Sequence, residues 1–147
     1  AMRIEALEGF RAWLRIRNWD NHFRMKKDNV VRDKSYVFAL KSVKLYQYLL
    51  KEKNEFVLSK QILRAATSVG ANVEEAIGAE SKKDFQHKLS IAYKEARETH
   101  YWLRLLKDAD YLDKEIATNF LAECDELLRI LGSILKTIKN WELGIRN

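Results

Sequence analysis

Apolar residues recur at helical spacing in four successive stretches, and this periodicity constrains the fold more than any other feature of the sequence. Side chains three or four residues apart lie on one face of an α-helix, and an apolar face must pack against other helices. The third stripe is unbroken and consists of Phe85, Leu89, Ala92, Ala96, Thr99, Leu103 and Leu106. The sequence therefore predicts long amphipathic helices.

The connections between the predicted helices are short and carry recognisable helix ends. Residues 51–55 contain no apolar side chain and are predicted to form the first turn, in which Asn54 can adopt a left-handed conformation. Ser81 and the residues after it resemble a capping box at the start of the third helix. The fourth helix can be capped by Asp110 or Asp113. These signals mark where the helices begin and end.

The absence of proline supports long helices, because proline breaks helix interiors. Four amphipathic helices joined by short turns pack most economically as an up-down-up-down bundle. We therefore predict an all-α protein, an antiparallel up-and-down four-helix bundle with an extra N-terminal helix. The bundle domain is predicted to cover residues 33–147, with Asp33 or Ser35 as its first cap. Residues 1–32 are predicted to form an amphipathic helical extension and a charged connector.

The N-terminal helix is predicted within residues 3–23, where arginines alternate with aromatic and aliphatic side chains. Such a helix can pack on its own or a neighbouring subunit's core, lie on a membrane surface, or bind bases and phosphates. If translation starts at Met25, the segment is dispensable. The arginines that could contact phosphates are Arg11, Arg15 and Arg17.

The stretch from Ser59 to Glu75 carries two different faces. Its apolar face is rich in alanine, and Gly70 lies within it at a cost of about 1 kcal/mol relative to alanine, which predicts a close helix contact. A polar stripe runs beside it, and such ladders fix the register of packing more than they stabilise it. The polar stripe consists of Gln61, Arg64, Ser68, Asn72 and Glu75.

The polar stripe is predicted to continue onto the third helix. In an antiparallel pair, Glu95 and Glu98 lie opposite the stripe. The contacts that we predict are Arg64 with Glu98 and Asn72 with Glu95. This arrangement favours a structural network over catalysis, because paired acids on helices are commonly structural.

The sequence carries no recognisable catalytic signature. The single cysteine, Cys124, lies on an apolar stripe, which predicts a buried, inert thiol and excludes a disulfide within the monomer. The Glu-x-x-His pairs of bundle di-metal sites and a glycine-rich phosphate loop are both missing. We therefore expect no enzyme, no metal and no cofactor. The histidines His22, His87 and His100 are predicted to be surface or interface residues.

The charge balance and the hydropathy limit the partners. The formal net charge is +6, which attracts acidic partners such as nucleic acid or anionic membranes, although it can also serve solubility alone. No apolar run approaches the length of a membrane span, and no signal peptide is visible. With a single cysteine, these features predict a cytoplasmic protein with no membrane partner.

The residues of the 59–75 stretch resemble a known family, the small four-helix bundle proteins named after the intervening sequences of 23S ribosomal RNA genes. That family commonly has the pattern S-x-Q-x-x-R-A-x-x-S-x-x-x-N-I-x-E-G. The matching residues here are Ser59, Gln61, Arg64, Ala65, Ser68, Asn72 and Glu75. Val73 replaces the usual isoleucine, and Ala76 stands where the family often has glycine. The resemblance covers roughly residues 33–142.

The resemblance implies a left-handed four-helix bundle that assembles into a ring-like homopentamer. It also extends to the accessory variability proteins of diversity-generating retroelements, which are basic pentameric bundles that bind nucleic acid and a reverse transcriptase. The family has no established enzymatic activity. From charge and resemblance together we predict a non-enzymatic homo-oligomer that binds RNA, in preference to DNA. The alternative is a protein-interaction scaffold without a nucleic-acid role. Further candidate phosphate contacts are Lys82, Lys83 and Lys88.

Overall fold

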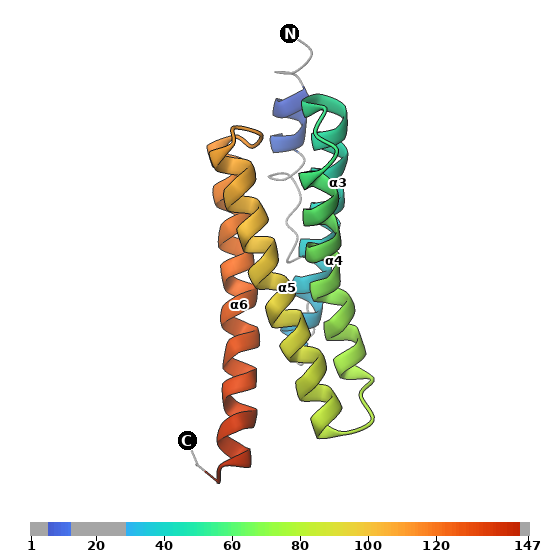
Figure 1. The fold of residues 1–147 in the computed structure, drawn as a ribbon, viewed down its shortest axis with the longest axis vertical. Helices are drawn as coiled ribbons and strands as arrows, with labels where there is room; N and C mark the ends of the chain where they lie inside the picture. Colours follow the sequence, from blue (N-terminus) through green and yellow to red (C-terminus); the bar gives the residue numbers. More distant parts are fainter. Residues whose placement is uncertain (1–5, 13–28, 145–147) are drawn as a thin grey trace.

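The computed structural model describes residues 6–12 and 29–144. Its long helices are α3 (Val30–Lys53), α4 (Leu58–Ile77), α5 (Lys82–Asp108) and α6 (Lys114–Glu142). Consecutive helices run in opposite directions, and a short helix over residues 6–12 lies at the end of the bundle where α3 finishes (Figure 1). The described residues therefore confirm the predicted all-α, up-and-down bundle with an extra N-terminal helix.

Helix α4 buries an alanine-rich face, and it packs against both α3 and α5. Ala65, Ala66 and Val69 are fully buried, as the alanine-rich face predicted. The two core phenylalanines come from other helices, and Phe38 of α3 meets Phe120 of α6 edge to face at 6.2 Å. Each large apolar side chain buried in this way contributes about 1.5–3 kcal/mol.

At Gly70 the backbones of α3 and α4 lie close together. A Cβ atom at this position would lie 3.3 Å from the backbone oxygen of Ser35, which is tighter than ordinary van der Waals contact. Ser35 is itself buried and its hydroxyl donates to the backbone oxygen of Arg32. The predicted close contact at Gly70 is therefore confirmed, and the missing side chain allows the two backbones to approach.

The helix ends agree with the predicted signals except at the start of α3. Asn54 ends α3 with a positive φ of 50°, and the Asp113 side chain caps α6 by accepting from the Glu115 N–H at 3.0 Å. The prediction that Asp33 or Ser35 caps the first bundle helix is wrong. The helix begins at Val30 instead, because the apolar side of the helix extends back into the supposed connector, where Val31 packs against the core.

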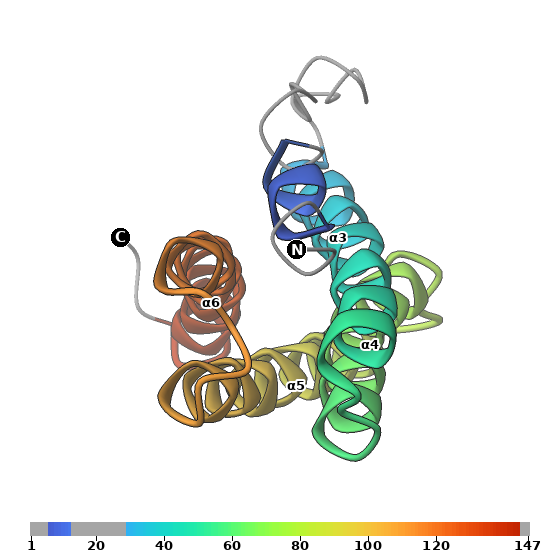
Figure 2. The same ribbon diagram turned by 90° about the horizontal axis from the view of Figure 1, so that it is seen from above.

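One edge of the bundle is more open than the others. Seen from above, the four helices form an arc, and α3 and α6 stand at its two ends (Figure 2). These two helices contact each other least among the neighbouring pairs. Ion pairs bridge the gap, between Lys34 and Glu126 at 2.8 Å and between Lys41 and Glu123. The α3–α6 edge is therefore joined by these ion pairs as well as by the contact between Phe38 and Phe120.

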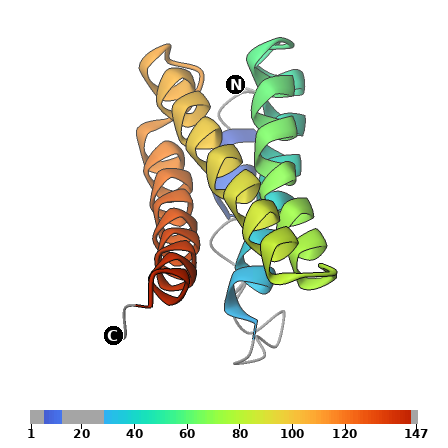
Figure 3. The same cartoon turned by 60° about the horizontal axis from the view of Figure 1, so that its bottom comes forward.

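The bundle also widens toward the start of α5. Figure 3 shows α5 and α6 close together at their connection and farther apart at the other end of the bundle. An apolar cavity of about 490 Å³ lies at this wide end, lined among others by Phe85, Leu89, Ile130 and Ile134.

Within the ranges that the structure describes, no helix has the length and hydropathy to cross a lipid bilayer.

Candidate functional site

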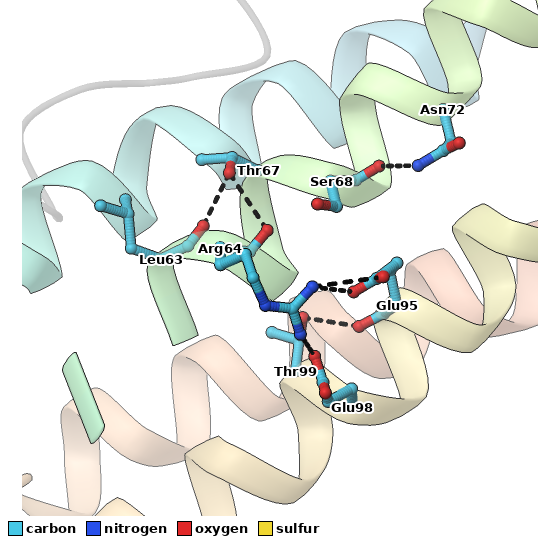
Figure 4. Close-up of polar contacts among 8 residues, drawn as sticks. All are labelled: Leu63, Arg64, Thr67, Ser68, Asn72, Glu95, Glu98 and Thr99. Carbon is cyan, nitrogen blue, oxygen red and sulfur yellow. Dashed lines mark hydrogen bonds and ion pairs between the residues drawn. The ribbon is translucent and has the colours of Figure 1, made fainter. Parts of the chain in front are cut away.

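The polar stripe of α4 meets α5 at Arg64. The Arg64 guanidinium lies between two carboxylates of α5 (Figure 4), with Nη1 at 3.3 Å and 3.4 Å from the oxygens of Glu95 and Nη2 donating to Glu98. The predicted contact of Arg64 with Glu98 is confirmed, and Glu95 joins it. The three side chains form a short ladder across the α4–α5 seam.

Asn72 does not take part in this ladder, so the predicted contact of Asn72 with Glu95 is wrong. The Asn72 side chain donates instead to the backbone oxygen of Ser68, at 2.8 Å on its own helix (Figure 4). Its short side chain reaches the carbonyl one turn back more easily than a neighbouring helix. Glu95 is meanwhile held by the longer side chain of Arg64.

The rest of the stripe faces the surface. Glu75 accepts from Lys88 of α5 at 3.0 Å, while Gln61 is exposed and its side chain makes no hydrogen bond among the described residues. The Arg64 side chain is 50% exposed. The stripe therefore lies at the solvent-facing rim of the seam and is not a buried network. Such exposed pairs set register and contribute little stability.

Replacing Arg64 with alanine is expected to lower the free energy of unfolding by about 0.5 kcal/mol, because half-exposed ion pairs are screened by solvent. Chemical unfolding followed by circular dichroism would measure it, with Gln61→Ala as a control at an exposed site of the same stripe. A loss above about 2 kcal/mol would contradict this account and indicate that the seam is buried in an assembly.

The structure places the predicted phosphate contacts in different settings. Lys82 and Lys83 are exposed at the start of α5. Lys88 is paired with Glu75, and the Arg11 guanidinium is paired with Asp113 and Glu8. Arg15 and Arg17 lie outside the described residues. A phosphate would have to displace a carboxylate from Lys88 or Arg11, so Lys82 and Lys83 are the better placed candidates.

A basic face of α5, which the sequence reasoning missed, lies on its solvent side. At about 100° per residue, positions 83, 94, 97, 101 and 104 fall within a sector of about 80°. All five are exposed. We call this set the basic face: it consists of Lys83, Lys94, Arg97, Tyr101 and Arg104. Plotting charge on the helical wheel, opposite the apolar stripe, would have found it.

The basic face borders a cleft toward α6. The cleft has a volume of about 280 Å³ and is lined by Arg97, His100, Arg104, Asp125 and Leu128. His100 Nε2 lies 3.2 Å from Asp125. Neither arginine forms an ion pair with any described residue, so both guanidinium groups are available to a ligand. His100 is therefore at the surface, as predicted, and His87 is exposed, while His22 lies outside the described residues.

Cys124 confirms the predicted inert thiol. It is fully buried, and its Sγ atom donates to the backbone oxygen of Ala96 at 3.2 Å. Burial, together with a smaller effect of the charge of Asp125, raises the pKa of the Cys124 thiol to about 12. The thiolate that nucleophilic chemistry requires is therefore scarce. Among residues 6–12 and 29–144, no three potential metal ligands are gathered at one place.

The comparisons with known proteins match mainly the residues of the bundle. The family model of the 23S rRNA-intervening sequence protein matches residues 27–133. Among solved structures, the chain is similar to a protein of unknown function from the S23 ribosomal protein family of Bacteroides thetaiotaomicron, with a TM-score of 0.73 and 50% identity. That match covers 76% of this chain and 99% of the other. No curated protein matches.

Proposed function

This chain belongs to the 23S rRNA-intervening sequence protein family, and from that premise we propose that it is a non-enzymatic, oligomeric helical bundle that binds nucleic acid, RNA in preference to DNA. The observation that carries the proposal is the basic face of α5. Four of its five residues are cationic, and none of the four forms an ion pair among the described residues. Free cations on one helix face are suited to a phosphate backbone.

The arginines of the basic face provide the directional contacts. Arg97 and Arg104 are two helical turns apart, about 10 Å along the axis. A guanidinium can donate two parallel hydrogen bonds to a phosphate, which a lysine cannot. The cleft beside them provides a recess into which a phosphate could fit. These two residues are therefore the strongest candidates for backbone contacts.

Tyr101 of the basic face and the lysines at the start of α5 fit the same partner. Tyr101 is 49% exposed and offers an aromatic surface on which a base can stack. Lys82 and Lys83 stand at the start of α5, where the helix dipole also favours an anion. Asp108 is an acid near the end of this face, and Lys107 lies 3.9 Å from it. Exposed bases are available in single-stranded RNA, which favours RNA over duplex DNA.

The double substitution Arg97→Glu with Arg104→Glu is expected to weaken binding to a single-stranded RNA at least about 20-fold at ~0.1 M salt. The slope of log affinity against log salt should fall by about 1.4, since each lost contact removes about 0.7. Filter binding over a salt series would measure both. The control is Lys51→Glu with Lys139→Glu, which makes the same charge change at exposed sites of α3 and α6.

Two outcomes would contradict the proposal. Equal loss in the control pair would mean that net charge, and not the basic face, drives binding. Undetectable binding of the unmodified chain to RNA and DNA at low salt would favour the interaction scaffold instead. A protein partner that survives nuclease treatment in a pull-down would then support that alternative.

A further inference from the structure

We propose that the groove between the end of α3 and the start of α6 is a docking site for an amphipathic helix of a partner protein, and that residues 6–12 occupy it as an internal competitor. This interaction surface is separate from the basic face of α5 and does not depend on nucleic-acid binding. The partner helix that the groove fits carries two apolar residues three positions apart and an arginine directly after the second.

The apolar part of the groove is defined by what residues 6–12 bury. Leu7 and Phe10 are three residues apart, so they share one face of the short helix. Both pack against the bundle core. The Phe10 ring stacks on Tyr48 of α3, with centroids 5.1 Å apart and planes 16° from parallel. An aromatic anchor on a nearly buried tyrosine is typical of helix-in-groove recognition.

The polar part of the groove selects a cation. Arg11 pairs with Asp113 at the start of α6, and its Nε lies 3.9 Å from Glu115. The Asp113 carboxylate also caps α6, which fixes its position. The hydrogen bond from Arg11, together with the helix N–H groups, holds the pKa of Asp113 below its usual range against the effect of burial. The acidic rim is therefore charged and ready for a basic side chain.

Residues 6–12 are an addition to the bundle that the family shares. They lie outside the matched residues 27–133, and 76% of this chain suffices to cover 99% of the solved relative. The short helix sits beside Tyr48, whereas α3 begins at Val30, about 27 Å away along the helix. The described residues of the segment therefore pack near the end of α3 and far from its first residue, as a ligand of the groove would.

The groove is longer than its resident segment. A shallow, open depression of about 450 Å³ beside Arg11 and a pocket of about 330 Å³ beside Lys41 share Asn119 of α6 in their linings. A partner helix longer than residues 6–12 could therefore extend along the α3–α6 edge and gain contacts that the internal segment lacks. This difference would let a partner displace the segment.

The test compares the full chain with a released variant, Phe10→Ala with Arg11→Glu. The probe is a fluorescein-labelled peptide with the sequence of residues 1–14, followed by fluorescence anisotropy. A competing segment within the same chain acts at an effective concentration taken here as on the order of 1 mM, so a peptide with a Kd of ~0.1 mM should bind the released variant about tenfold more tightly than the unmodified chain. A peptide carrying the same two substitutions is the control and should bind neither.

Several outcomes would overturn the proposal. Equal affinity for both chains would mean that residues 6–12 do not occupy the groove, and no binding to the released variant would mean that the groove does not accept helices. A concentration-dependent dimer of the unmodified chain, lost in the released variant, would assign the groove to a second copy. Circular dichroism of each variant checks that it is folded. Arg11→Glu alone leaves the apolar contacts in place, so it should increase the affinity for the peptide less than the double substitution does.

Discussion

Replacing Gly70 with leucine is expected to lower the free energy of unfolding by about 3 kcal/mol, because overfilling a packed contact forces backbones apart. Even the first carbon of the new side chain would lie 3.3 Å from the Ser35 backbone oxygen, and the neighbouring atom is backbone and cannot rotate away. Thermal unfolding should show a loss of about 10 °C for a chain of this size.

Alanine at the same position separates the two effects that act on Gly70. It improves helix propensity by about 1 kcal/mol, while its Cβ meets the tight contact. We expect these effects to cancel within about 1 kcal/mol. A leucine variant as stable as the alanine variant would show that α3 and α4 are not held at this distance, and would remove the reason for the glycine.

Gly70 also shows what the sequence could determine about the fold. A glycine in the middle of an alanine-rich apolar face predicts a close contact between helices, and the stripe of α5 predicts its buried residues, including Leu89 and Leu103. Both predictions depend only on the spacing of residues within a single helix. The bundle follows because four such stripes have few ways to cover one another.

The candidate site was less accessible from the sequence, because it depends on which residues of different helices meet. Arg64 reaches across the seam to two acids, whereas Asn72 bonds within its own helix, and side-chain length decides between them. Apolar periodicity identifies the residues that a helix buries, whereas the basic face of α5 consists of residues that point to solvent. Finding it requires plotting the charged positions of the helix. The role of residues 6–12 depends on Tyr48 and Asp113, which lie on distant parts of the chain.

Glu55 is a second residue whose role the sequence did not reveal. It lies in the predicted turn 51–55, yet its side chain is buried and caps the start of α4. The carboxylate accepts hydrogen bonds from the N–H groups of Val57 at 3.0 Å, Leu58 at 2.9 Å and Ser59 at 2.6 Å. The usual caps are shorter residues directly before the helix, so a glutamate two residues earlier gives no familiar signal.

Replacing Glu55 with alanine is expected to cost about 2 kcal/mol, at the upper end of the range for a cap, because three backbone donors lose their acceptor. Chemical unfolding at pH 7 would measure the loss. Glu52→Ala is the matched control, since Glu52 lies in the last turn of α3 and no described residue forms an ion pair with it. A loss no larger than in this control would mean that water replaces the carboxylate at no cost.

The stabilisation of the folded state by Glu55 should also decrease as pH falls, because its surroundings lower the pKa of its carboxyl group. Burial acts to raise the pKa of Glu55, but the hydrogen bonds from Leu58, Ser59 and Val57 together outweigh it, and the pKa is lowered. A group whose pKa is lower in the folded state stabilises fully above its unfolded pKa, about 4.3, and loses that effect as pH falls through the folded value.

Glu55→Gln keeps one oxygen acceptor but cannot titrate. The difference in unfolding free energy between the unmodified chain and Glu55→Gln should therefore shrink as pH falls from about 6 to about 3. A difference that stays constant over this interval would show that the charge of Glu55 does not stabilise α4, and that the cap acts through neutral hydrogen bonds alone.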